Sequence, residues 1–311
     1  MCSEIDCMAS YAKAARRRRT LLSRSFPRLG RGRRVNERLV SAIQPESTEG
    51  VQYHISAKRG QVGNYVFLPG DPDRVPKIAK LWDSAHEVSS HREYRIWSGM
   101  INGTMVSACS TGIGCPATAI AIEELSRIGG NTFIRVGSCG SLLPDLDCGQ
   151  LAISTAAVRL DGTSKQYVTA AYPAAASYDV TLALIEAAEK LGKKYRAGYT
   201  ASTDSFYVGQ GRPGVEDYLP TDAKTLIETL RKQHVITMEM EASAIFTLAG
   251  IYGFRSGCVL AVYANRATNK FEVKGEEDAC EVAVEAVRIL SKWDMDRQRA
   301  GKRDWSPSLS Y

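Results

Sequence analysis

The sequence predicts an α/β protein with a single three-layer domain, in which helices flank a central mixed β-sheet. From about residue 64, short apolar runs such as NYVFLPG and NTFIRVGS alternate with longer segments such as DVTLALIEAAEKLG, whose apolar residues recur every three or four positions. This alternation is typical of strands and helices that build one sheet in turn. The composition agrees, because 44% apolar and 24% charged residues among 311 are ordinary for a globular domain with a sizeable core.

Each predicted element follows from a local pattern. Short runs of β-branched and small apolar residues that end in glycine, serine or asparagine predict strands. The expected strands are 64–69, 104–109, 131–138, 150–160, 196–203 and 256–265. Segments with their apolar residues on one helical face predict helices. The expected helices are 73–82, 116–129, 179–192, 221–233, 241–253 and 277–293.

The formal net charge of +6 is concentrated at the N-terminus. Residues 1–45 include RRRR at 16–19 and LGRGRR at 29–34, carry few acids and lack a periodic apolar pattern. We therefore expect a basic, disordered N-terminal extension at 1–45, the α/β domain at 46–295 and a polar C-terminal tail at 296–311. Three interpretations of the extension stay open: no role, organelle import, or binding of RNA or an anionic surface.

Composition also excludes several classes of protein. No apolar run approaches the roughly 20 residues that a membrane span needs, so no membrane partner is expected. The eight cysteines form no C-x-x-C pair, which suits neither a disulfide framework nor a zinc site and favours a reducing compartment, the cytoplasm. Because the basic charge lies in the extension, nothing predicts nucleic-acid binding by the domain.

The turns after the predicted strands contain candidate anion-binding groups. In open α/β sheets, ligands bind at the carboxyl ends of the strands. GDPDR supplies Gly70 and Arg74, and RVGSCGS supplies Arg135 and Ser138. STGIGCPA leads into a helix N-terminus, whose free N–H groups favour an anion. These turns predict one site for a negatively charged ligand.

Two further motifs, GIGCPA and SFYVGQGR, bear on the kind of ligand that this site binds. GIGCPA also matches the dinucleotide-binding pattern, but the expected acidic residue after the next strand is absent and Arg135 stands there. SFYVGQGR offers Phe206 as a stacking face, with Gln210 and Arg212 as donors and acceptors for a flat heterocycle, although a surface loop would have the same composition. With no nucleophile signature or H-E-x-x-H pair, positioning and electrostatics are the expected means of catalysis.

The motifs GDPDR, SHREY, STGIG, RVGSCGS, SFYVGQGR, TMEMEAS and YANR occur in an order and spacing that resembles the bacterial uridine phosphorylases of the hexameric nucleoside phosphorylase family. The resemblance runs from about His54 to Trp293. It implies reversible phosphorolysis of uridine to uracil and ribose 1-phosphate, through an oxocarbenium-like transition state and without a covalent enzyme intermediate. It also implies dimers that share active sites within a hexamer.

The same resemblance assigns roles to individual residues. The implied phosphate site is Gly70, Arg74, Arg135, Ser138 and, from a neighbouring subunit, Arg92. The implied ribose site is His54, Met240 and Glu241. The implied uracil site is Phe206, Gln210, Arg212, Glu239 and Arg266, with Arg135, Glu241 and Arg266 as catalytic residues. TMEMEAS is expected to begin a helix, with Glu239 holding Arg212 in place.

The chain departs from the family pattern at several positions. Ser138 replaces the usual threonine but keeps the hydroxyl. Tyr263 and Ala264 replace branched aliphatic residues, which changes the pocket beside the base and leaves the ranking of uridine, deoxyuridine and thymidine open. Some members of the family have an interface potassium site, and Glu93 and Ile113 match its ligands. Ala117 replaces the serine whose oxygen completes that site, so no cofactor or metal is expected, while binding of a structural potassium ion stays open.

Three alternative functions stay open from the sequence. Two of them use the same fold: a purine nucleoside phosphorylase, and a nucleosidase that uses water instead of phosphate. The purine enzyme carries an aspartate where this chain has Arg266. The third alternative is a nucleoside-binding protein that has lost catalysis. Phosphate dependence and base preference separate these possibilities.

Overall fold

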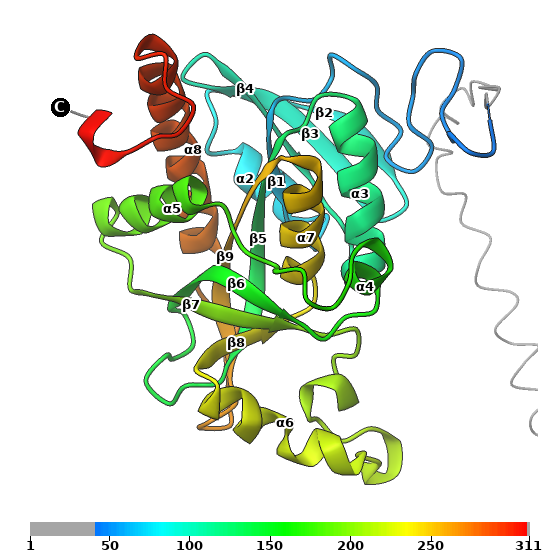
Figure 1. Ribbon diagram of the computed structural model, residues 1–311, viewed down its shortest axis with the longest axis vertical. Coiled ribbons are helices and arrows are strands. Elements are labelled where there is room, and N and C mark those ends of the chain that lie inside the picture. The colour runs from blue at the N-terminus through cyan, green and yellow to red at the C-terminus, as the bar shows by residue number, and fades with distance from the viewer. Residues whose placement is uncertain (1–40, 310–311) are drawn as a thin grey trace, which may run out of the picture. The chain divides into compact units, whose positions relative to one another are not determined.

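The computed structural model describes residues 41–309, and the expected N-terminal extension lies outside the described residues as far as residue 40 (Figure 1). The strands are β1 (Tyr65–Leu68), β2 (Ser84–His91), β3 (Tyr94–Ile101), β4 (Thr104–Cys109), β5 (Thr132–Ser141), β6 (Leu151–Arg159), β7 (Tyr195–Ser202), β8 (Val235–Glu239), β9 (Arg255–Asn265) and β10 (Lys270–Phe271). The helices are α2 (Arg74–Ala79), α3 (Cys115–Arg127), α4 (Thr163–Tyr167), α5 (Tyr178–Lys190), α6 (Thr221–Lys232), α7 (Ala242–Tyr252) and α8 (Glu276–Arg299). Among these residues, none of the helices has the length and apolar character to cross a membrane.

The strands form one mixed sheet in the order β10-β9-β6-β7-β8-β5-β1-β4-β3-β2. Strand β5 is central, because it pairs in parallel with β1 and β9 and antiparallel with β8. The extra pairing of β9 with β5 closes β5, β9, β6, β7 and β8 into a ring. The carboxyl ends of β1, β4 and β9 are therefore gathered around the end of β5.

Helices cover both faces of the sheet, as the predicted three-layer fold requires. Helices α2, α5 and α8 share an apolar cluster with one face, and α3 and α7 share a second cluster with the other face. Successive residues of β5 contribute to opposite clusters: Ile134 packs in the first and Phe133 in the second. The expected fold class is thus confirmed.

The sequence patterns missed several elements. The β2–β3 hairpin was not predicted because β2 carries mostly polar, exposed residues on its outer edge. TMEMEAS was expected to begin a helix, but Glu239 ends β8 and the helix begins at Ala242. Strand β10 and helix α4 are too short to give a periodic signal.

The C-terminal segment packs against the domain beyond residue 295, where a polar tail was expected to begin. Helix α8 continues to Arg299. Beyond it, the ring of Trp305 stacks on Trp293 with centroids 3.8 Å apart, and the Tyr178 hydroxyl donates to the Trp305 carbonyl at 2.8 Å. Trp305 is only 9% exposed.

We predict that Trp305→Ala lowers the free energy of unfolding by about 3 kcal/mol, because a large aromatic side chain is removed from a packed site. Urea unfolding monitored by circular dichroism measures the change. Val215→Ala, at a position that is 88% exposed, is the control and should change stability by less than about 0.5 kcal/mol. Equal effects of the two substitutions would show that the tail contributes nothing to stability.

Candidate active site

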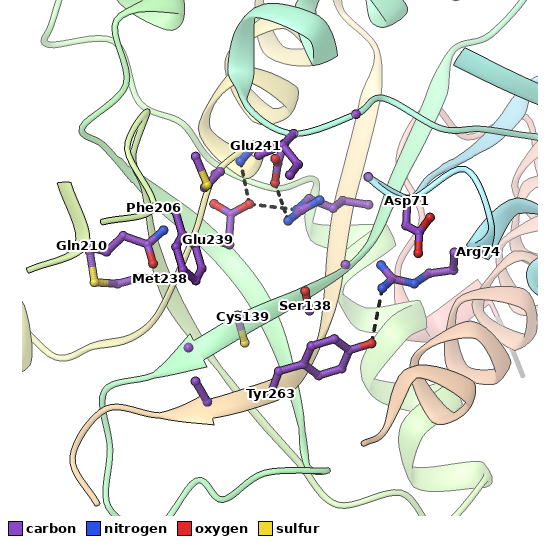
Figure 2. A pocket seen from close by; sticks show the side chains of 18 of the residues that line it. Asp71, Arg74, Ser138, Cys139, Phe206, Gln210, Met238, Glu239, Glu241 and Tyr263 are labelled. Carbon is purple, nitrogen blue, oxygen red and sulfur yellow. Dashed lines mark hydrogen bonds and ion pairs between the residues drawn. The ribbon is translucent and has the colours of Figure 1, made fainter. Parts of the chain in front are cut away.

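A cavity of about 510 Å³ opens where β1, β5, β8 and β9 end (Figure 2). Its volume lies within the roughly 300–1,000 Å³ that is usual for small-molecule sites. The predicted site residues that line it are Gly70, Arg74, Arg135, Ser138, Phe206, Gln210, Arg212, Glu239, Met240 and Glu241. In Figure 2, Gln210 and Arg74 lie on opposite sides of the cavity, with Glu239 and Glu241 between them.

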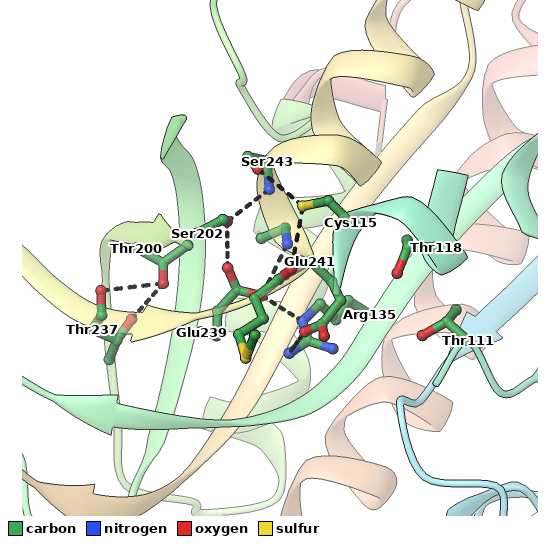
Figure 3. A network of polar contacts seen from close by, with 12 residues as sticks. Thr111, Cys115, Thr118, Arg135, Thr200, Ser202, Thr237, Glu239, Glu241 and Ser243 are labelled. Carbon is green, nitrogen blue, oxygen red and sulfur yellow. Dashed lines mark hydrogen bonds and ion pairs between the residues drawn. The ribbon is translucent and has the colours of Figure 1, made fainter. Parts of the chain in front are cut away.

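Arg135 is the charged centre of the site. It lies on strand β5, in which every residue except Ser138 is buried, and is 4% exposed. Its Nε donates to Glu239 Oε2 at 2.8 Å, and its Nη2 lies 2.5 Å from Glu241 Oε2 (Figure 3). Burial opposes the charge of Arg135, but the adjacent carboxylates of Glu241 and Glu239 raise its pKa above the ordinary value, so the guanidinium stays charged.

Glu239 does not hold Arg212, contrary to the sequence-based expectation. One of its carboxylate oxygens accepts Arg135 and also the backbone N–H groups of Glu241 and Ala242, at 2.8 and 2.9 Å. The other accepts the hydroxyl of Ser202. Glu239 therefore caps the start of α7 and fixes Arg135 at the same time. The reason is that Glu239 ends a strand, which points its side chain into the sheet end and away from the loop of Arg212.

Glu241 stands at the start of α7, directly beside the cavity. Its Oε1 accepts the backbone N–H of Gly114 at 2.5 Å, which ties the β4–α3 turn to α7. Burial raises the pKa of Glu241 above its ordinary value, while Arg135 acts in the opposite direction. The two glutamates of TMEMEAS thus have different tasks. Glu239 is committed to contacts with Arg135, Ser202 and the start of α7, whereas Glu241 lines the cavity with Oε1 on the Gly114 N–H and Oε2 on Arg135.

Gly137 allows the Arg135 guanidinium to lie close against the backbone of its own strand. A Cβ atom at residue 137 would stand 2.7 Å from Arg135 Cζ and 2.8 and 2.9 Å from its two Nη atoms. Such contacts are too short, and the paired carboxylates leave the guanidinium little room to move. Glycine is therefore required here by close approach.

The other side of the cavity is built by the loop 205–212. The Arg212 guanidinium lies 3.9 Å from the Phe206 ring centroid, and its Nη1 donates to Gln210 Oε1 at 2.6 Å and to the Phe206 carbonyl at 2.7 Å. The Gln210 amide donates to Thr203 Oγ1 at 3.2 Å. Burial and the nearby charge of Arg266 lower the pKa of Arg212 to about 10. These contacts hold an aromatic face, an amide and a guanidinium together.

Arg266 donates to backbone carbonyls of this loop and does not line the cavity. Its Nη1 donates to the Gln210 carbonyl at 2.9 Å and its Nη2 to the Gly211 carbonyl at 3.4 Å. Burial lowers the pKa of Arg266. In this arrangement the residue positions Gln210, whereas the resemblance implied that Arg266 belongs to the uracil site and is catalytic.

Tyr263 was expected to shape the pocket beside the base, and no part in the site was predicted for Glu276, yet both contact Arg74. Tyr263 lines the cavity, and its hydroxyl contacts both Arg74 and Glu276. Glu276 begins α8 and accepts hydrogen bonds from Arg74 and Lys77. No local sequence pattern indicates this cluster, because Glu276 lies about 200 residues from Arg74 and acidic residues at a helix start are common for electrostatic reasons alone.

His54 and Arg92 lie together, but neither lines the cavity. The His54 ring Nδ1 lies 2.6 Å from the buried carboxylate of Glu124, and the His54 carbonyl lies 2.9 Å from His91 Nδ1. Arg92 is exposed in the tight turn between β2 and β3, with a φ of +56°, and its guanidinium faces the ring of Tyr53 at 5.7 Å. The single chain therefore does not bring these two residues to the site.

Within residues 41–309, no group of three or more His, Cys, Asp or Glu side chains has a metal-binding arrangement. The backbone carbonyl of Ala117, the residue that stands where the potassium site has a serine, accepts a hydrogen bond from the Tyr94 hydroxyl at 2.9 Å. The thiol of Cys139 lines the cavity, but burial raises its pKa well above the ordinary value, so it stays protonated. Charge placement is what this cavity provides.

The chain belongs to the phosphorylase superfamily, whose family model matches residues 64–292. It is 58% identical over 273 residues to the uridine phosphorylase of Thermococcus kodakarensis, which covers 88% of this chain and 99% of the relative. It is 38% identical over 236 residues to the uridine phosphorylase of Escherichia coli, with 74% and 93% covered. A guanosine phosphorylase of Halorubrum lacusprofundi is 37% identical over 214 residues, with 69% and 83% covered.

We predict that Glu276 makes stability depend on acid pH. Although burial opposes its charge, hydrogen bonds from Lys77 and the charge of Arg74 lower its pKa from 4.5 to about 2. A carboxyl group whose pKa is lowered by folding stabilises the fold above its unfolded pKa, and this contribution disappears as the pH falls through the folded pKa. The difference in Tm between wild type and Glu276→Gln should therefore shrink between pH 5 and pH 2.5. A constant difference across that range would contradict the ion cluster.

Proposed function

We propose that this chain catalyses the reversible phosphorolysis of uridine to uracil and ribose 1-phosphate. Membership of the phosphorylase superfamily and the uridine phosphorylases at 58%, 40% and 38% identity support this function. The observation that carries it is a single cavity with two guanidinium groups, those of Arg74 and Arg135, on one side and the Gln210 amide with the Arg212 guanidinium on the other. Such a cavity suits a ligand set with an anion on the arginine side, a base with carbonyl and imide groups on the Gln210 side, and a sugar between them.

In the proposed reaction, phosphate attacks C1′ of the ribose while the bond from C1′ to N1 of uracil breaks. The electron pair of that bond leaves with the base, and the proton of the hydrogen phosphate ends on the base. The ribose gains positive charge in the transition state, so a phosphate dianion beside C1′ stabilises it. Arg74, Arg135, Ser138 and the backbone at Gly70 would hold the phosphate in place, which requires no covalent enzyme intermediate.

The remaining cavity residues would hold the nucleoside. Glu241 accepts hydrogen bonds from the ribose hydroxyls, and Met240 provides the apolar surface against the sugar. Gln210 and Arg212 read the carbonyl and imide groups of uracil, while Phe206 covers its ring. Arg266 takes part through the Gln210 carbonyl, which it holds at 2.9 Å.

We further propose that Arg92 and His54 complete the site of a second subunit, in dimers that assemble into a hexamer. The charges of the single chain support this, because the cavity side of Arg74 and Arg135 also contains the carboxylates of Glu239, Glu241 and Glu276. A phosphate dianion among these groups needs more positive charge than one chain supplies. The exposed guanidinium of Arg92 would provide it.

The reaction is tested by measuring uracil release from uridine by the purified full-length chain, with and without phosphate. We expect release that requires phosphate and produces one ribose 1-phosphate per uracil. Guanosine and inosine test the purine alternative, and thymidine tests the fit beside the base. Release at equal rates without phosphate would indicate a nucleosidase, and preference for guanosine would show that the Gln210 and Arg212 assignment is wrong.

The shared site is tested by mixing two inactive variants, Arg92→Ala and Arg135→Ala, by joint refolding. If Arg92 acts in the neighbouring subunit, each mixed dimer contains one intact site, and random mixing should restore about a quarter of wild-type activity. If Arg92 acts within its own chain, or only stabilises the fold, the mixture stays as inactive as its components. Arg92→Ala refolded with itself is the control.

A further inference from the structure

The guanidinium of Arg74 is held from several directions although it belongs to the cavity. Arg74 is 6% exposed. Its Nε and Nη2 donate to Glu276 Oε2 at 3.0 and 2.8 Å, its Nη1 to the Val136 carbonyl at 3.1 Å, and its Nη2 also to the Tyr263 hydroxyl at 3.3 Å. These contacts use four of the five N–H groups of arginine, which leaves one on Nη1 for an anion.

Tyr263 connects this guanidinium to the wall of the cavity. Its ring lines the cavity, and its hydroxyl donates to Glu276 Oε2 at 2.9 Å while it accepts from Arg74 (Figure 2). Burial raises the pKa of Tyr263 to about 12, so the hydroxyl keeps its proton and its donor role at neutral pH. Phenylalanine at this position would fill the same space without either contact.

Glu276 is itself fixed at the start of α8. Lys77 Nζ lies 2.5 Å from Glu276 Oε1, which leaves Oε2 to Arg74 and Tyr263. The preceding residue, Gly275, has a φ of +82°, and a Cβ atom there would stand 2.7 Å from the Gly149 carbonyl oxygen. The close approach to Gly149 restricts the backbone before Glu276, and the hydrogen bonds from Lys77, Arg74 and Tyr263 restrict its carboxylate.

We propose that Tyr263 and Glu276 are positioning residues of the phosphate site, which hold the Arg74 guanidinium so that its remaining N–H meets the phosphate. The inference rests on the proposed phosphate role of Arg74. The Arg74 guanidinium makes four hydrogen bonds within the chain, so its side chain is already ordered before an anion binds. Binding therefore costs little further side-chain entropy. The Tyr263 side chain thus has two tasks: its ring forms part of the cavity wall, and its hydroxyl helps to hold Arg74.

Two conservative variants test the proposal. Tyr263→Phe keeps the ring and removes the hydroxyl. Glu276→Asp keeps the charge but moves the carboxylate one methylene further from Arg74. For each we expect the KM for phosphate to rise about three- to tenfold, with the KM for uridine and the kcat at saturating phosphate within about twofold of wild type. Stabilisation by phosphate, read as the rise in Tm, should shrink in the same two variants.

Tyr195→Phe is the matched control. The Tyr195 hydroxyl donates to Glu189 Oε1 at 2.8 Å, which is also a tyrosine–glutamate hydrogen bond but lies outside the cavity. This variant should leave both KM values unchanged. It separates the loss of any such bond from the loss of the one at Arg74.

The outcomes distinguish this inference from the function on which it rests. An unchanged KM for phosphate in both variants of a phosphate-dependent enzyme would overturn the positioning role and leave the function intact. A fall in kcat with no change in the KM for phosphate would also overturn it, because the side chains would then act on the chemical step. If wild-type turnover needs no phosphate, the proposed function and this inference fail together.

Discussion

The buried ion cluster of Arg135 with Glu239 and Glu241 is the interaction on which the site depends. A guanidinium that is 4% exposed loses most of its hydration, a cost of several kcal/mol that only well-placed carboxylates can offset. Glu239 does so while it also caps α7, and Glu241 does so while it binds Gly114. One set of contacts therefore joins β5, β8, α7 and the β4–α3 turn. Removal of any member would leave a buried charge or buried N–H groups unpaired, which typically costs about 3–5 kcal/mol for a buried ion pair.

This cluster also places a guanidinium and a carboxylate side by side at the cavity, each paired with the other. Arg135 Nη2 and Glu241 Oε2 pair at 2.5 Å. If phosphate binds to the guanidinium and ribose to the carboxylate, as we propose, the two substrates replace contacts that the pair already provides. Their binding then exchanges polar contacts and needs little new desolvation, and the fixed dipoles and charges favour the transition state because they need not reorganise.

The residues at the strand ends are easier to predict from the sequence than the residues that they contact. Arg74 and Arg135 could be predicted because the strand before each is a clear apolar run and because ligands bind where such strands end. The partner of Glu239 could not, since it depends on whether that residue ends a strand or begins a helix, and TMEMEAS fits both patterns. Glu276 was missed because contacts between residues so far apart in the chain leave no local pattern. Arg266 was placed correctly at a strand end, yet its direction toward the loop carbonyls depends on the fold of that loop.

The two sides of the cavity are held by different kinds of contact, and this difference bears on specificity. The side with Arg135 is fixed by buried ion pairs between elements distant in sequence, so a substitution there disturbs several strands and helices at once. The opposite side is fixed mainly by contacts inside one loop, such as that between Arg212 and Gln210, with Phe206 46% exposed at its edge. Changes in that loop cost the core little. If Arg74 and Arg135 hold phosphate as proposed, a fold built in this way can alter the base it accepts and keep its phosphate residues, which agrees with relatives named for uridine and for guanosine at 58% and 37% identity.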